Sequence, residues 1–171
     1  MKKEKGFTLI ELLIVIAIIA VLAGVVFVAL NPLKRFKDSR DSRRAADIQS
    51  ILTAIKVHQA DNGGYLMNPI ESLAAGTTYM IGDGSTVACG LKNADCATIA
   101  TTTGGCLNLN GSVATTSLVL GGYLGSIPIS PNGTGSWNAS TTGYTLYKSS
   151  TGAITIRACE VEGPAELVFS R

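Results

Sequence analysis

One acidic side chain interrupts a long apolar run near the start of the sequence. Of the 24 residues from Phe7 to Leu30, 21 are apolar and only Glu11 is charged. A carboxylate held deep in hydrocarbon costs about 2–3 kcal/mol or more, so a simple membrane anchor is not expected to contain one. Glu11 also lies only about 6 Å along a helix from Phe7, so it could instead be a tolerated residue at headgroup depth. We regard it as a candidate functional carboxylate.

Cysteines are the second set of residues with distinctive chemistry: Cys89, Cys96, Cys106 and Cys159. If this part of the chain is exported, their even number favours two disulfides. A zinc site is not expected, because no Cys-x-x-Cys pair occurs and His58 is the one histidine. Of the three pairings we prefer Cys89–Cys96 with Cys106–Cys159, the second closing a loop worth about 4 kcal/mol. Reduced, buried thiols are the alternative.

Residue combinations typical of enzymes are missing from the sequence. It has no nucleophile paired with a base, no phosphate-binding glycine loop and no pair of carboxylates at a suitable spacing. His58 is expected on a helix surface rather than as a ligand or base. Between Asn110 and Arg157 there is no Asp or Glu, so a calcium site there would lack its usual ligands. We predict a protein that is not an enzyme, with no catalytic residue, metal or cofactor.

Charge and apolar residues are both distributed unevenly. The chain has 171 residues and is 46% apolar; residues 1–44 carry a net charge of +5 and residues 45–171 one of −3. A nucleic-acid-binding domain would be expected to place its Lys and Arg on the folded part, but here the folded part carries the negative net charge. A polytopic membrane protein and a wholly disordered chain are excluded, because one apolar stretch precedes a region able to form one modest core. We expect one domain and one membrane-spanning helix.

The string KGFTLIEL at residues 5–12, which continues as LIVIAIIA, closely resembles the class III leader and N-terminal helix of type IV pilins and pseudopilins. The resemblance implies that prepilin peptidase cleaves after Gly6 and that the new N-terminal residue, Phe7, is N-methylated. It also implies that Glu11 pairs with the N-terminal ammonium of a neighbouring subunit during assembly. Such a pair is physically sensible, because the two charges attract strongly in low dielectric, whereas either one alone is costly to bury.

The elements that position these residues follow from the apolar pattern. We expect a cleaved leader over 1–6, a transmembrane and filament-core helix over 7–31, and an amphipathic helix over 32–62, with a kink at Pro32. Apolar residues at helical spacing between 45 and 55 should pack on the head domain. The acidic residues expected on the outer face of this helix are Asp38, Asp41 and Asp47.

The region over 63–171 is predicted to be a loop-rich β head domain. The sequence DNGG at 61–64 predicts the end of the long helix. Tyr144–Lys148 and Ala153–Cys159 predict an antiparallel hairpin, and residues 122–131 before it also resemble pilin and pseudopilin heads. Further strand candidates lie at 78–81, 107–109, 115–120 and 166–169. The expected fold class is α+β: a long N-terminal helix packed on a small antiparallel sheet.

The basic residues between Lys34 and Arg44 affect the prediction of which side of the membrane the head domain lies on. A simple positive-inside count would leave the head domain in the cytoplasm. The leader and the cysteines favour export instead. A nucleic acid or an anionic lipid is one possible partner of this cluster, but a solvated helix face, partly paired by Asp38 and Asp41, is favoured.

These features favour a structural subunit of a type IV pilus-like surface filament. It would be a single-pass membrane protein with an extracytoplasmic head before assembly, and part of a cell-surface pilus afterwards. Its expected partners are copies of itself in a helical filament, prepilin peptidase, an inner-membrane assembly platform and the membrane. The alternatives are a pseudopilin of a type II secretion or DNA-uptake system and a membrane-anchored adhesin that does not polymerise. The missing acidic loop favours a pilus subunit over a calcium-binding pseudopilin.

Overall fold

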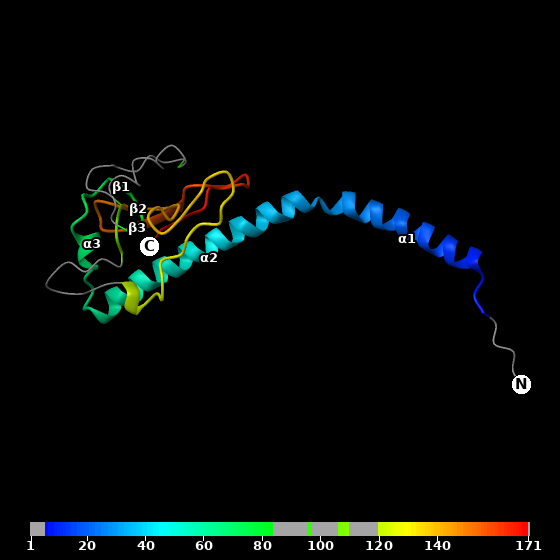
Figure 1. Ribbon diagram of the computed structural model, residues 1–171. Helices are drawn as coiled ribbons and strands as arrows, with labels where there is room; N and C mark the ends of the chain where they lie inside the picture. The colour runs from blue at the N-terminus through cyan, green and yellow to red at the C-terminus, as the bar shows by residue number, and fades with distance from the viewer. Residues whose placement is uncertain (1–5, 84–95, 97–105, 110–119, 171) are drawn as a thin grey trace, which may run out of the picture. The chain divides into compact units, whose positions relative to one another are not determined.

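The computed structural model of the protein describes residues 6–83, 96, 106–109 and 120–170. The chain divides into two compact units, Met1–Phe36 and Lys37–Arg171. Its elements are helices α1 (Leu9–Leu30), α2 (Pro32–Asp61) and α3 (Asn68–Glu71), the 3-10 helix η2 (Leu120–Gly122), and strands β1 (Thr78–Met80), β2 (Tyr144–Lys148), β3 (Ile154–Ala158) and β4 (Val168–Ser170) (Figure 1). The fold is α+β, as the sequence predicts.

Helix α1 is an apolar helix with none of its residues buried. Its 22 residues extend about 33 Å at 1.5 Å per residue, close to the thickness of a bilayer's hydrocarbon core, about 30 Å. In the described part of the chain it is the one helix long and apolar enough to cross a membrane. It ends at Leu30, and Asn31 follows in the left-handed conformation with φ 40°. Helix α2 then begins at Pro32.

In the second unit, α2 supplies one wall of the core. Ile48, Ile51, Leu52 and Ile55 are buried at helical spacing, which confirms the predicted apolar stripe. The helix ends at Asp61, where Gly63 and Gly64 adopt positive φ. The N–H of Gly64 donates to the carbonyl of Gln59 at 2.8 Å, which satisfies a carbonyl at the helix end.

The four strands form one antiparallel sheet in the order β1-β2-β3-β4. The predicted hairpin is confirmed: β2 pairs with β3, with Leu146 opposite Ile156. The edge strands β1 and β4 also fall close to predicted positions. Leu107 makes only an isolated bridge with Ile81, so no strand forms at 107–109. The candidate at 115–120 lies outside the described residues, except for Leu120, which begins η2.

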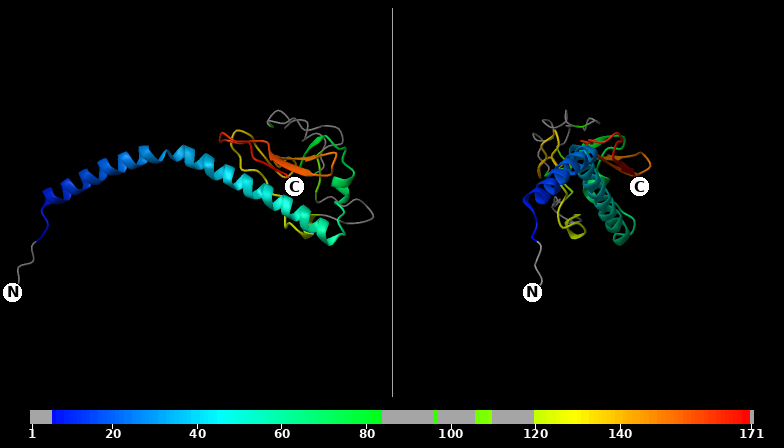
Figure 2. Two further views of the ribbon diagram at one scale, coloured as in Figure 1. Left: turned by 180° about the vertical axis from the view of Figure 1, so that it is seen from behind. Right: turned by 90° about the vertical axis from the view of Figure 1, so that its right-hand side faces the viewer.

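The main core lies between α2 and the sheet, which lie alongside each other in both views of Figure 2. Burial alternates along β3, whereas the first three residues of β2 are all buried. Apolar side chains of both strands pack with those of α2, α3 and η2 in one core. The fully buried apolar side chains of this core outside α2 include Met67, Ile70, Leu120, Tyr144, Leu146, Ile154 and Ile156.

Candidate functional site

Glu11 lies in the first turn of α1, where it forms a reciprocal capping box with Thr8. The Glu11 carboxylate accepts hydrogen bonds from the backbone N–H and the hydroxyl of Thr8, both at 2.8 Å. The N–H of Glu11 donates to the Thr8 hydroxyl at 3.3 Å. A carboxylate here also interacts favourably with the positive end of the helix dipole. In a single subunit Glu11 therefore has a local role that leaves its side chain exposed.

Gly6 and Phe7 precede this cap and are surrounded by open space. A Cβ placed on Gly6 would meet no atom within 4 Å. Phe7 is 86% exposed. Within the described residues, packing in the subunit does not determine the residue type at either position. A requirement for glycine at position 6 would have to come from another protein.

A second constellation is centred on Arg44, whose side chain is wholly buried between α2 and the loops of the head. Its guanidinium forms ion pairs with Asp41 at 2.6 Å, Glu162 at 3.3 Å and Glu160 at 3.5 Å. It also donates to the Ser130 hydroxyl and the Pro131 carbonyl. We call Arg44 with these three carboxylates the Arg44 cluster. It joins α2 to the segment after β3 and to the loop before β2.

Two neighbouring contacts extend the Arg44 cluster. Arg40, one turn earlier on α2, forms an ion pair with Glu162. The Asp41 carboxylate accepts the backbone N–H groups of Glu162 and Gly163, the latter at 2.7 Å. Because this turn of α2 binds both side chains and backbone of residues 160–163, it fixes the path of the chain between β3 and β4.

The two glutamates of the cluster are held in the ionised form. Burial alone would raise the pKa of Glu160, but hydrogen bonds from Thr134, Trp137 and Gly135 bring it below its ordinary value. A hydrogen bond from Arg40 lowers the pKa of Glu162, and Arg44 lowers it further. Lowered carboxyl pKa values mean that the folded state is favoured above the ordinary Glu pKa and loses that advantage as the pH falls.

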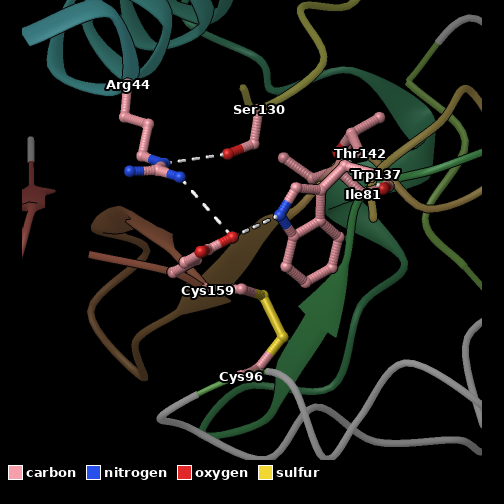
Figure 3. Close-up of a disulfide and its surroundings, with 8 residues drawn as sticks. Arg44, Ile81, Cys96, Ser130, Trp137, Thr142 and Cys159 are labelled. Carbon is pink, nitrogen blue, oxygen red and sulfur yellow. Dashed lines mark hydrogen bonds and ion pairs between the residues drawn. A yellow bond between two sulfur atoms is a disulfide. The ribbon is translucent and has the colours of Figure 1, made fainter. Parts of the chain in front are cut away.

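Figure 3 shows a disulfide between Cys96 and Cys159 beside this cluster. Cys106 is also disulfide-bonded, and Cys89 lies outside the described residues. Both preferred pairings are therefore wrong, because Cys96 and Cys159 are joined to each other. Sequence spacing could not show that residue 96 comes next to the end of β3.

The disulfide belongs to a small second core of Met80, Cys96, Cys106, Trp137 and Cys159. The indole N–H of Trp137 donates to the Glu160 carboxylate at 3.1 Å, which connects this core to the Arg44 cluster. Gly143 permits the packing: it has φ +81°, and a Cβ there would lie 2.6 Å from the Trp137 ring.

A peptide map under non-reducing conditions tests the corrected pairing. We expect one cross-linked peptide pair that contains Cys96 and Cys159. Because the bond joins residues separated by 63 positions, its reduction should lower the free energy of unfolding by about 4 kcal/mol in the chain-entropy model. A Cys106–Cys159 peptide pair in the native protein would contradict the assignment.

The polar residues of α2 differ from the predicted arrangement. The sequence predicts Asp41 and Asp47 on the outer face, but Asp41 belongs to the Arg44 cluster and Asp47 accepts the Tyr144 hydroxyl at 2.7 Å. It predicts His58 at the surface, but His58 is fully buried. Arg44 and His58 fall on the same helical stripe as Ile48, so position on the stripe was the signal that could have placed them inside.

His58 is an unusual group in this core. Its ring lies edge-on to Tyr123, with the ring centres 5.4 Å apart. Neither ring nitrogen has a hydrogen-bond partner within the described part of the chain. Burial lowers the pKa of His58, against the opposing charge of Asp61. The folded structure therefore favours the neutral form of His58.

This burial predicts a dependence of stability on pH. Below the ordinary His pKa of 6.5, protonation favours the unfolded chain, so stability should fall until the lowered pKa is passed. Replacement by His58→Leu should remove this slope and raise the free energy of unfolding by about 1 kcal/mol, because two unsatisfied polar atoms disappear. Urea unfolding between pH 5 and about 8 measures both effects. Equal pH profiles for the two proteins would contradict the prediction.

A metal centre has no basis in the described residues, since they contain no group of three or more His, Cys, Asp or Glu side chains able to hold an ion. The features that stand out are an exposed apolar helix with one capped carboxylate and a head domain fixed by ion pairs and a disulfide. They define an α+β protein whose N-terminal helix is long and apolar enough to cross a membrane.

Comparison with protein families identifies that end of the chain. Residues 1–27 match the family described as the prokaryotic N-terminal methylation motif. The chain thus carries the class III leader of type IV pilins and pseudopilins, as the sequence predicts. The searches of curated proteins and of solved structures gave no match.

The motif has three consequences. It supports a type IV pilin-like or pseudopilin protein, a family that is structural rather than catalytic. It implies processing by prepilin peptidase and assembly at a membrane. Together with the single apolar helix, it fits a membrane-anchored precursor.

Proposed function

We propose that the protein is a structural subunit of a type IV pilus-like surface filament. Prepilin peptidase cleaves it after Gly6, the new terminus at Phe7 is N-methylated, and the head domain lies outside the cytoplasm. The subunit then leaves the membrane through an assembly platform and joins a helical filament of identical subunits. In the filament, adjacent α1 helices pack against one another, and these contacts take the place of the contacts with lipid.

The observation that carries this proposal is that no residue of the apolar helix α1 is buried in the single subunit. Exposed apolar area on this scale requires either lipid or other copies of the helix. The Glu11 carboxylate supports contact with other copies of the helix as the final environment. It can give up its hydrogen bonds from Thr8 and bind the N-terminal ammonium of a neighbouring subunit instead. A static anchor would need this carboxylate only as a helix cap.

Two other functions are compatible with the motif. A pseudopilin of a type II secretion or DNA-uptake system would share the leader and α1. A membrane-anchored adhesin that does not polymerise would share the helix but would need neither Gly6 nor Glu11. We favour the pilus subunit because the stretch from 110 to 157 has no Asp or Glu for a calcium site.

Cleavage is tested by Gly6→Val. The substitution should not affect folding, because a side chain at position 6 meets no atom within 4 Å. We expect the precursor to accumulate uncut, whereas the unsubstituted chain begins at an N-methylated Phe7. Mass spectrometry of the intact membrane protein separates the two. A cleaved Gly6→Val chain would contradict the assigned site.

Filament formation is tested on material sheared from the cell surface. If the protein is a filament subunit, the sheared fraction should contain it as a sedimentable polymer with the processed N-terminus. A pseudopilin should instead remain with the cell envelope at ordinary expression. An adhesin should stay in the membrane fraction with its leader attached.

A further inference from the structure

The first turn of α2 combines exposed apolar and cationic side chains. Leu33 is 73% exposed and Phe36 is 64% exposed. They are three residues apart, so they lie on the same side of the helix. Lys34 and Arg35 lie between them in the sequence and are also exposed. Aromatic and aliphatic groups mixed with Lys and Arg are typical of segments at a membrane–water interface.

The spacing along the first unit places this turn at headgroup depth. Helix α1 is about as long as the hydrocarbon core is thick. Only Asn31 and Pro32 separate its end at Leu30 from Leu33. When α1 spans a membrane, residues 33–36 therefore fall where the phosphate groups of the far leaflet lie. At the other end, Glu11 falls near the headgroups of the first leaflet.

Among the residues that the structure describes, no acidic side chain forms an ion pair with the cations of this turn. Arg40 and Arg44 pair with carboxylates of the head domain. In contrast, within the described residues neither Lys34 nor Arg35 takes part in an ion pair. Asp38 is the nearest acidic residue in the sequence, and the charge of the adjacent Lys37 offsets its own. The basic run thus divides into paired cations that stabilise the head domain and unpaired ones next to the span.

We propose that Lys34 and Arg35, flanked by Leu33 and Phe36, bind anionic phospholipid headgroups on the head-domain side of the membrane. The binding fixes the depth of α1 before assembly. This inference rests on the membrane-anchored precursor of the proposed function. It also gives a physical partner to cations that a simple positive-inside count would assign to the cytoplasm.

Lipid preference is the first test. The full chain, purified in detergent, is titrated with phosphatidylglycerol or phosphatidylcholine, and bound lipids are counted by native mass spectrometry. We expect a preference for phosphatidylglycerol that Lys34→Gln/Arg35→Gln weakens by roughly tenfold or more, because each cation near an anionic surface contributes several-fold. The matched control is Arg43→Gln/Lys56→Gln, which removes the same charge from elsewhere on α2 and should keep the preference.

Depth is the second test. Phe36→Trp is made together with Trp137→Phe, so that the introduced indole is the sole tryptophan, and the chain is reconstituted in phosphatidylglycerol vesicles. Lipids brominated near the headgroup should quench its fluorescence more strongly than lipids brominated near the chain end. A chain with Trp137→Phe alone provides the blank.

The outcomes are separable. Equal lipid preference in the Lys34→Gln/Arg35→Gln variant and its control would overturn the inference, and so would an unquenched tryptophan at position 36. If that variant instead loses contacts with acidic surfaces of neighbouring subunits and keeps its lipid preference, the cations serve the filament and not the membrane. A chain that fails to insert into vesicles at all would overturn the membrane-anchored precursor itself.

Discussion

Cells that produce the Glu11→Ala variant should insert the chain in the membrane but make no normal filaments. The substitution removes the one charge within α1, which makes insertion easier. In the proposed filament it also leaves the N-terminal ammonium of a neighbouring subunit without a counter-charge in the apolar core. A single buried charge of this kind is strongly unfavourable. We therefore expect loss of assembly, measured as the polymer recovered by shearing, with unchanged amounts of membrane-bound subunit.

The capping box provides a matched control for this result. Glu11→Ala also removes the carboxylate half of the capping box of α1, which weakens the start of the helix. Thr8→Ala removes the hydroxyl half of the same capping box, including the bond from the Glu11 N–H, and leaves the carboxylate. Filaments from Thr8→Ala together with none from Glu11→Ala would assign the effect to the charge. Normal filaments from Glu11→Ala would exclude the proposed role of Glu11.

Arg44→Met should lower the free energy of unfolding of the head domain by about 3–5 kcal/mol, because it removes one partner of a buried ionic group. Methionine keeps much of the volume and leaves Asp41, Glu160 and Glu162 close together without the guanidinium. Urea unfolding followed by the fluorescence of Trp137, whose indole N–H binds Glu160, reports on this region directly. Arg43→Met, at an exposed neighbouring position, should change stability by no more than about 0.5 kcal/mol.

Arg44→Met should also change how the stability of the head domain depends on pH in acid. In the unsubstituted protein the pKa values of Glu160 and Glu162 lie below their ordinary value of 4.5. The ionised carboxylates therefore stabilise the fold when the pH is above 4.5. That stabilisation is lost as the pH falls below 4.5. Without Arg44, protonation of Glu162 relieves repulsion, so acid should destabilise the variant less. Identical unfolding midpoints for Arg44→Met and Arg43→Met would show that the cluster does not hold the head together.

Local patterns were enough to predict most of the fold. Helix α2, the hairpin of β2 and β3, and the helix end at Asp61 follow from apolar periodicity and from glycine positions. The leader motif follows from a contiguous string of residues. These features depend on short stretches of chain, so a single sequence contains the information that they need.

The errors concern contacts between distant segments. The pairing of Cys96 with Cys159 depends on how a long loop returns to the end of β3. The charge of Arg44 predicts a surface position, whereas its place on the apolar stripe of α2 puts it inside. Its burial depends on Glu160 and Glu162, more than a hundred residues away in the sequence, which supply the compensating charge.

Whether this chain builds a surface filament is seen by electron microscopy of the cell surface with the gene intact, deleted and restored. We expect long filaments that vanish on deletion and return with the intact gene. Filaments of unchanged number and length in the deletion strain would contradict a role as the main structural subunit.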